Sequence, residues 1–122
     1  MNTMIKELKP NQIFIFGSNL NGNHAGGAAK QAMEFGAVWG QGEGLQGQSY
    51  AFPTLDKYMI KRSKSELERS IYLLKKCAKE NPDKEFLLTK VGCGIAGYDE
   101  LYMIKLFKRF SLPKNIIKPE NW

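Results

Sequence analysis

Residues 13–16, with the sequence Ile-Phe-Ile-Phe, place four β-forming side chains next to one another near the start of the chain. An apolar residue at every position is typical of a strand that is buried on both faces of a sheet. Three further runs of β-forming residues, at 49–52, 85–91 and 115–118, predict three further strands. We expect the run at 49–52 to end at Pro53, because proline lacks the amide hydrogen that a strand ladder needs.

Three stretches between these strands are predicted to be helices. Residues 26–35 carry several alanines, which allow close packing on a sheet, and Gly36 is suited to end this helix. A longer helix with apolar residues at helical spacing is predicted to begin near Ser63 and to end before Pro82, since the residue before a proline disfavours the helical conformation. A third helix follows Asp99, whose side chain can cap its amino end. The start of the longer helix offers two overlapping capping boxes, Ser63 with Glu66 and Ser65 with Glu68.

Strands and helices alternate along the chain. This order predicts one α/β domain over residues 1–122, with a mostly parallel sheet and helices on both of its faces. At 122 residues the domain is large enough to bury a hydrophobic core without disulfides or metal ions. Residues 40–48 contain four glycines, too many for a stable strand or helix, so we expect a loop there.

Two glycine-rich segments follow predicted strands. Residues 17–29 lead into the first helix, and residues 92–97 precede the third. In a parallel sheet, loops that follow strands emerge at the same carboxyl edge, where ligands bind in open α/β folds. Uncovered backbone amides bind phosphate groups, so two such loops favour a ligand with two phosphates. The alternative for residues 92–97 is a tight turn between strand and helix that binds nothing.

Four side chains in or beside these loops are candidates for chemistry. The amide of Asn19 can donate to a ribose hydroxyl or a phosphate, or it can hold its own loop through an Asx turn. His24 is the single histidine of the chain and the candidate for a pH-dependent role, although the surrounding Asn and Gly residues favour a solvated or backbone-bonded ring. Cys93 has no histidine nearby in sequence, which favours a packed thiol over a nucleophile. Tyr98 is expected over a sugar or a base, or else in the core.

The composition of the chain indicates which partners and which compartment to expect. The chain carries 18 Lys and Arg against 12 Asp and Glu, a net charge of +6 that favours anionic partners. Many cations lie between residues 57 and 84, interleaved with acids, which favours a solvated helix face over a nucleic-acid patch, although the patch stays an alternative. Two distant cysteines, Cys77 and Cys93, indicate neither disulfides nor a metal site. No run of about 20 apolar residues predicts a membrane span, so we expect a cytoplasmic protein. We also expect it to hold no metal and no cofactor.

Both loops together resemble those of macrodomains, the α/β/α modules that bind ADP-ribose. Residues 14–29 are similar to the first strand, asparagine-bearing loop and glycine-rich helix start of that family, and residues 91–98 are similar to its second phosphate loop. Residues 16–19, 41–44 and 95–98 also resemble a group of small macrodomain-like proteins of bacteria and phages. The resemblance implies a three-layer α/β/α fold with a mostly parallel central sheet, and a cleft for ADP-ribose or a related nucleotide.

The resemblance also implies roles for individual residues. Residues 26–28 would flank the diphosphate on one side and residues 92–97 on the other, with Asn19 near the distal ribose. One hydrolytic branch of the family has an aspartate in the second loop, where this chain has Ala96, and a lysine for which Lys57 is only a loose counterpart. The expected ligand-binding residues are Gly17, Ser18, Asn19, His24, Gly26, Gly27, Ala28, Gly92, Cys93, Gly94, Ile95, Ala96, Gly97 and Tyr98.

Binding of ADP-ribose or a related diphosphate nucleotide is therefore the function that the sequence favours. One alternative is a hydrolase that removes ADP-ribose from protein or nucleic acid. Asn19 and His24 are its candidate catalytic residues, and the attacking water would be held by Asn19, by His24 or by the substrate's own phosphate. The other is a basic protein that binds nucleic acid through its net positive charge.

Overall fold

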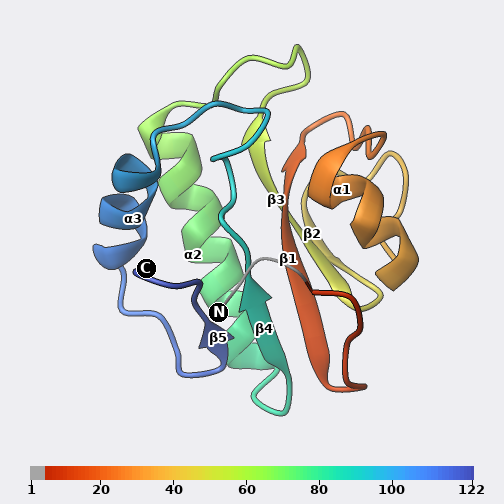
Figure 1. Ribbon diagram of the computed structural model, residues 1–122. Helices are drawn as coiled ribbons and strands as arrows, with labels where there is room; N and C mark the ends of the chain where they lie inside the picture. Colours follow the sequence, from red (N-terminus) through yellow and green to blue (C-terminus); the bar gives the residue numbers. More distant parts are fainter. Residues whose placement is uncertain (1–4) are drawn as a thin grey trace.

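A computed structural model describes residues 5–122 as an α/β fold around one five-stranded sheet (Figure 1). The strand order is β2-β3-β1-β4-β5, and all neighbouring strands are parallel except β2 and β3. The predicted mostly parallel sheet is therefore confirmed. The strands are β1 (Gln12–Asn19), β2 (Gly44–Gln46), β3 (Ser49–Leu55), β4 (Glu85–Leu88) and β5 (Ile116–Ile117); the helices are α1 (Gly27–Ala32), α2 (Lys64–Glu80) and α3 (Glu100–Lys108), and a 3-10 turn, η1 (Met33–Phe35), follows α1.

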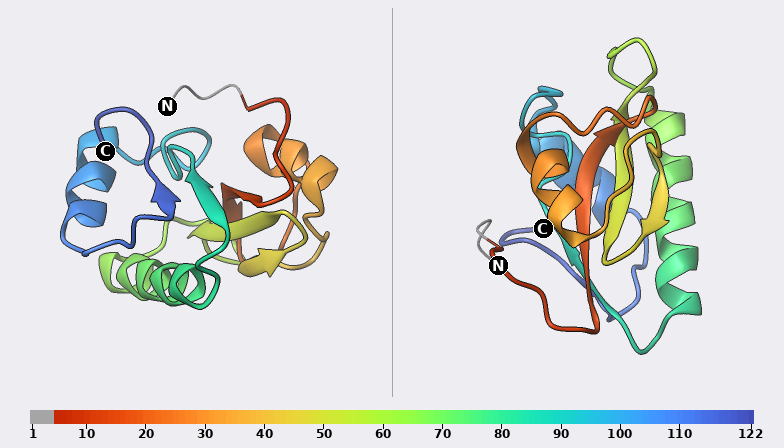
Figure 2. Two further views of the ribbon diagram at one scale, coloured as in Figure 1. Left: turned by 90° about the horizontal axis from the view of Figure 1, so that it is seen from below. Right: turned by 90° about the vertical axis from the view of Figure 1, so that its right-hand side faces the viewer.

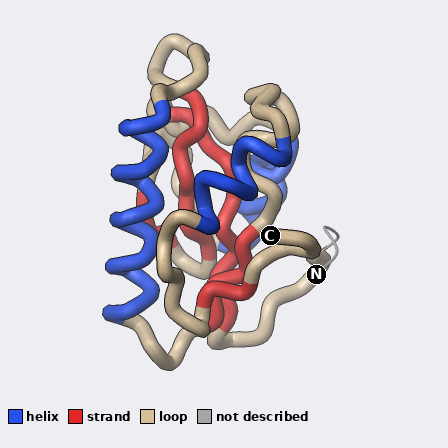
Figure 3. The backbone as a smooth tube through the Cα atoms, turned by 90° about the vertical axis from the view of Figure 1, so that its left-hand side faces the viewer, coloured by secondary structure: helices blue, strands red, loops and turns tan. Residues whose placement is uncertain are grey.

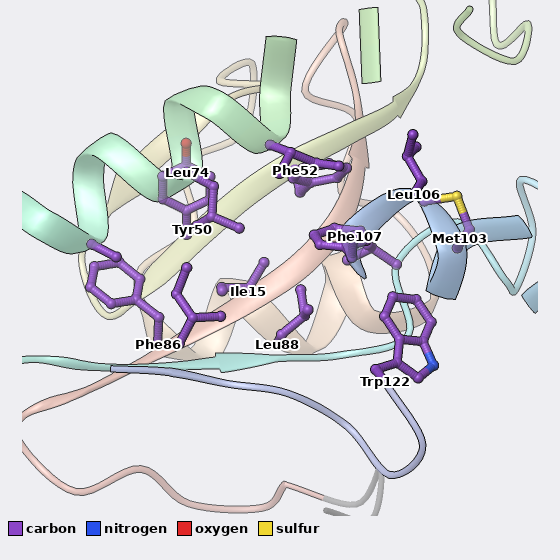
Figure 4. Packing of buried hydrophobic residues seen from close by; sticks show 14 of the residues in the cluster. Ile15, Tyr50, Phe52, Leu74, Phe86, Leu88, Met103, Leu106, Phe107 and Trp122 are labelled. Atoms are coloured by element: carbon purple, nitrogen blue, oxygen red, sulfur yellow. The ribbon is translucent and has the colours of Figure 1, made fainter. Parts of the chain in front are cut away.

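Side chains of β1 alternate between two hydrophobic clusters. Ile13 and Ile15 belong to the larger cluster, which includes apolar residues of α2 and α3, whereas Phe14 and Phe16 pack with the alanines of α1. Accordingly α1 lies on one side of the sheet and α2 and α3 on the other (Figure 2), and α2 runs alongside the strands (Figure 3). Figure 4 shows Ile15 of the larger cluster among side chains of both helices and of the carboxyl end. The prediction of a strand buried on both faces is confirmed.

Two strands extend beyond their predicted ends. β1 continues through Gly17, Ser18 and Asn19, which we expected in a loop. β3 continues through Pro53 to Leu55. Proline is tolerated there because β2 pairs with β3 only at residues 49–51, so no second strand requires the missing amide hydrogen.

The predicted ends of two other strands were also wrong, because both strands are shorter than expected. β4 ends at Leu88 instead of residue 91, because the amide of Val91 donates to the carbonyl of Thr89 at 2.8 Å and turns the chain before Gly92. The predicted strand at 115–118 forms only at Ile116–Ile117.

The expected loop at residues 40–48 contains a strand, β2. It pairs antiparallel with the first three residues of β3. Gly47, with a φ of 61°, lies in the two-residue connection between the strands, where a hairpin turn requires a left-handed residue. Glycine in this segment therefore provides the turn that makes the pairing possible.

Helix ends agree closely with the caps expected from the sequence. Ser63 and Glu66 form the capping box of α2, which ends at Glu80 before Pro82; the overlapping box beginning at Ser65 is not used, because Ser65 is already helical. Gly36 ends η1 with a φ of 101°. None of the helices formed by the described residues is long and apolar enough to cross a membrane.

Candidate functional site

A cleft of about 470 Å³ opens at the carboxyl edge of the parallel strands. The end of β1 and the segment after β4 meet in it, where a Cβ on Gly17 would lie 3.4 Å from the amide nitrogen of Gly92. The cleft brings together ten of the residues expected to bind a ligand: Gly17, Ser18, Asn19, Gly26, Gly27, Ala28, Gly92, Gly94, Ile95 and Ala96. His24, Cys93, Gly97 and Tyr98 do not line it.

Residues 26–29 provide one part of the cleft wall. Gly26 is the N-cap of α1, and no side chain caps this helix. Gly27 adopts a left-handed φ of 61°. The amides of Gly27, Ala28 and Ala29 donate no hydrogen bond to any of the residues 5–122, as expected for the first turn of an uncapped helix. These amides are available to an acceptor outside the protein.

Residues 92–97 provide a second part of the wall. The loop is folded by two backbone hydrogen bonds, from the amide of Gly97 to the carbonyl of Gly94 at 3.0 Å and from the amide of Tyr98 to the carbonyl of Gly92 at 2.8 Å. The amides of residues 94–96 have no such partner within the described chain. A Cβ on Gly27 would lie 3.8 Å from Cδ1 of Ile95, so one added methyl group would be enough to bring the two loops into van der Waals contact.

The side chains of Asn19 and Ser18 form hydrogen bonds with backbone groups near the cleft. The side-chain nitrogen of Asn19 donates to the carbonyl of Asn23, and its oxygen accepts from the amide of Asn23, both at 3.0 Å. One amide hydrogen of Asn19 is left for a ligand. The Ser18 hydroxyl is buried and donates to the carbonyl of Gly42 at 2.6 Å. Both side chains therefore hold backbone segments in place. For Asn19, holding its own loop is one of the two roles that the sequence suggested, the other being donation to a ligand.

His24 is buried, contrary to the expectation of a solvated or backbone-bonded ring. Its exposed fraction is 1%, its ring packs edge-on to Phe16 with centroids 5.2 Å apart, and neither ring nitrogen has a partner among residues 5–122. The cause is a contact distant in sequence. The amide of Gly40 donates to the carbonyl of Gly22 at 2.9 Å, and this brings Trp39 beside the imidazole, with centroids 6.4 Å apart.

Cys93 packs against the larger hydrophobic cluster and does not line the cleft. Burial, and after it the Glu100 carboxylate, raises the pKa of the Cys93 thiol. A raised pKa disfavours the thiolate that a nucleophile requires. The expectation of a packed thiol therefore agrees with the structure.

Tyr98 follows the second loop directly and does not line the cleft. Its hydroxyl is within hydrogen-bonding distance of two carbonyl oxygens, those of Thr54 at 2.8 Å and Arg62 at 3.0 Å. Its ring stacks on Tyr102 with centroids 6.2 Å apart, and the Nζ of Lys61 lies 5.2 Å from the ring centroid. Tyr98 thus joins the loops that follow β3 and β4.

Three further residues at the cleft were missed by the sequence reasoning. Lys90 lines the cleft and pairs with Glu100 at 3.3 Å. Lys61 donates to the carbonyl of Gly97 at 2.9 Å. Met59 lines the cleft with a φ of 63°, in a turn that Asp56 holds through its backbone and side chain. Lys90 falls inside the predicted strand at 85–91, and Met59 and Lys61 lie several residues beyond the predicted strand at 49–52, so no local signal in the sequence marked them.

Ionisable side chains are scarce at the cleft. Lys90 is the one such side chain among the described residues that line it. Two acids in the adjoining segments are engaged in their own elements: Asp56 in the turn around Met59, and Asp99 as the N-cap of α3. A hydrogen bond from Nε1 of Trp122 and the ammonium of Lys90 lower the pKa of Glu100. The cleft therefore offers backbone amides and one cation, which suits binding of an anion.

Comparison with protein-family models, curated proteins and solved structures gave no match for this chain. The resemblance to macrodomains therefore stays a prediction.

Proposed function

We propose that the cleft binds ADP-ribose or a related nucleotide with two phosphates, placed between residues 26–28 and residues 94–96. The observation that carries the proposal is the pairing of two segments with unpartnered amides on one cleft. An anion that accepts from both segments would satisfy donors that no residue in 5–122 satisfies.

The size and charge of the cleft agree with this ligand class. Its volume of about 470 Å³ falls within the range of about 300 to 1,000 Å³ that small-molecule sites occupy. Gly26 and Gly94 have open space where a Cβ would stand, so a phosphate can approach the backbone closely. The net charge of +6 raises the local concentration of anions.

We extend the proposal to the fold. A mostly parallel sheet with α1 on one face and α2 and α3 on the other supports a three-layer, macrodomain-like arrangement. Two glycine-rich loops at the carboxyl edge of that sheet are the feature on which the resemblance depends.

The proposal is confined to binding. General acid and base catalysis requires a titratable group within hydrogen-bonding reach of the substrate. Lys90 is the one titratable side chain among the described residues that line the cleft, and it is paired with Glu100. His24, one of the two candidate catalytic residues, is covered and lies outside the cleft lining.

Calorimetry and thermal unfolding with ADP-ribose test the proposal. At about 100 times the dissociation constant the ligand should add roughly 2.7 kcal/mol to the free energy of unfolding. Inorganic pyrophosphate should compete with it, and adenosine, which lacks phosphate, should bind far more weakly. No heat and no thermal shift at millimolar ADP-ribose would refute the proposal.

A salt titration separates this function from nucleic-acid binding. If the basic surface binds nucleic acid, affinity for an oligonucleotide should fall steeply with salt, because counterions are released. ADP-ribose should not compete in that case. Competition at constant salt would instead place both ligands in the cleft.

A further inference from the structure

A second hollow adjoins the cleft on the other side of the first glycine loop. It has a volume of about 660 Å³. Three residues, Ala25, Gly27 and Gln31, line both the cleft and this hollow, so the two are neighbours. We call it the Trp39 hollow; the remaining lining residues are His24, Lys30, Met33, Glu34 and Trp39.

The Trp39 hollow presents an aromatic surface with polar groups at its border. Trp39 is 56% exposed and Met33 is 41% exposed, although both are large and apolar. Lys30 and Glu34 add one charge of each sign. An exposed indole with nearby donors and acceptors is suited to a planar heteroaromatic ring, which stacks on the indole and forms hydrogen bonds at its edge.

His24 supplies the second, independent observation. Its exposed fraction is only 1%, and it lines the Trp39 hollow. Both of its ring nitrogens lack a hydrogen-bond partner among residues 5–122. Buried polar atoms are almost always hydrogen-bonded, so an orphaned pair calls for a partner outside the described chain. A neutral imidazole offers one donor and one acceptor. The two nitrogens point in different directions, so one edge of a nucleobase or of a carboxamide-bearing ring can meet one of them.

Access to the imidazole nitrogens requires a neighbouring side chain to move, and Trp39 is an exposed neighbour of the ring. The His24 nitrogens are covered in this structure, and the indole lies 6.4 Å from the imidazole by ring centroids. Trp39 is more than half exposed, so its side chain can turn without unpacking the core. A ring that stacks on the turned indole would then lie beside His24.

We propose that the Trp39 hollow receives a planar nitrogen heterocycle of the nucleotide whose phosphates occupy the cleft, stacked on Trp39 and hydrogen-bonded by His24. This inference rests on the proposed function, because the phosphates fix where the attached ring can reach. Two rings have this chemistry, adenine and nicotinamide, and the choice of ligands separates them.

The test uses two variants of the hollow and one control. His24→Phe keeps an aromatic ring in the packed site but removes both nitrogens, and Trp39→Ala removes the stacking surface. Tyr72→Ala is the control, since Tyr72 is a comparably exposed aromatic residue, 59% exposed, on α2 across the sheet. Binding of ADP-ribose, NAD⁺ and inorganic pyrophosphate is measured by calorimetry, with thermal unfolding to confirm that each variant is folded.

Both hollow variants should weaken a ring-bearing ligand by about tenfold, the order of magnitude expected for loss of one stacking contact. Pyrophosphate should bind within about twofold of wild type, and Tyr72→Ala should change nothing. Equal weakening of ADP-ribose and NAD⁺ assigns the hollow to adenine, which both contain; weakening of NAD⁺ alone assigns it to nicotinamide.

The outcomes separate failure of this inference from failure of the proposed function. If ADP-ribose and pyrophosphate bind wild type, but both variants bind every ring-bearing ligand as wild type does, the hollow has no such role and the cleft proposal stands. If wild type binds neither nucleotide nor pyrophosphate, both proposals are overturned. Should His24→Phe unfold, Trp39→Ala alone decides, because an exposed side chain is not needed for folding.

Discussion

Gly26→Ala tests the cleft most directly, because it adds one methyl group at a place where the protein itself has room. Gly26 lines the cleft, and an ideal Cβ there would meet no protein atom within 4 Å. Its backbone is extended, with φ of −147° and ψ of 166°, a conformation that alanine adopts without strain. The added methyl group therefore projects into space that a ligand would otherwise use.

The expected change in stability is small because two effects oppose each other. Replacing glycine by alanine in a compatible conformation stabilises by about 0.4 to 1 kcal/mol through the unfolded chain. Gly26 is also the N-cap of α1, where alanine is less favourable than glycine by an amount of similar size. For 122 residues the entropy of unfolding is roughly 0.26 kcal/mol per kelvin. A net change within about 0.5 kcal/mol therefore shifts Tm by no more than about 2 °C.

The expected loss of affinity is much larger. A methyl group beside the unpartnered amides of residues 27–29 keeps a phosphate from reaching them, and a hydrogen bond to a charged group contributes about 1.5 to 3 kcal/mol. ADP-ribose should therefore bind at least tenfold more weakly, as measured by calorimetry. Gly94→Ala makes the same change on the other wall, again with no protein atom within 4 Å of the new Cβ. Wild-type affinity in both variants, with both folded, would refute the placement of the diphosphate.

Three further predictions concern the scaffold. Gly22→Ala should lower the free energy of unfolding by roughly 2 to 5 kcal/mol, because a Cβ would stand 2.3 Å from the carbonyl carbon of Gly40 at a φ of +69°; a chemical denaturation midpoint equal to wild type would contradict this contact. Ser63→Ala should cost about 1 kcal/mol by removing the capping box of α2, a loss that Ser63→Asp should largely avoid. The hydrogen bond from Trp122 lowers the pKa of Glu100, so its stabilisation is complete above the ordinary carboxyl value near 4.3 and disappears as pH falls through the lowered pKa. Glu100→Gln should flatten the dependence of Tm on pH as the pH falls below the ordinary carboxyl value near 4.3; an unchanged slope would show that this carboxylate contributes nothing.

Local signals in the sequence were sufficient for most of the elements. The capping residues Ser63, Asp99 and Gly36 act on backbone groups within a few positions of themselves, so their effect does not depend on the rest of the chain. The strand at 13–16 was predictable because apolar residues at successive positions must be buried on both faces of a sheet. Placement of both glycine loops at one edge followed from parallel pairing.

Boundaries and short pairings required the neighbouring strands. Pro53 ends a strand only where its missing amide hydrogen is needed, and that depends on how far β2 extends beside β3. β2 has three residues and little intrinsic preference for a strand, so its formation depends on the partner that the turn at Gly47 brings to it.

Local sequence patterns were enough to predict an α/β chain with two glycine-rich loops after parallel strands, because periodicity, caps and turn residues act over a few positions. Contacts between distant parts of the chain determine which side chains of those loops are free to contact a ligand. The contact between Gly22 and Gly40 buries His24 under Trp39, and the turn at Asn23 occupies most of Asn19. Such contacts join residues far apart in the chain or depend on backbone angles, and no local pattern reports them. The first loop therefore offers mainly its backbone amides to the cleft, while its single histidine faces a different hollow.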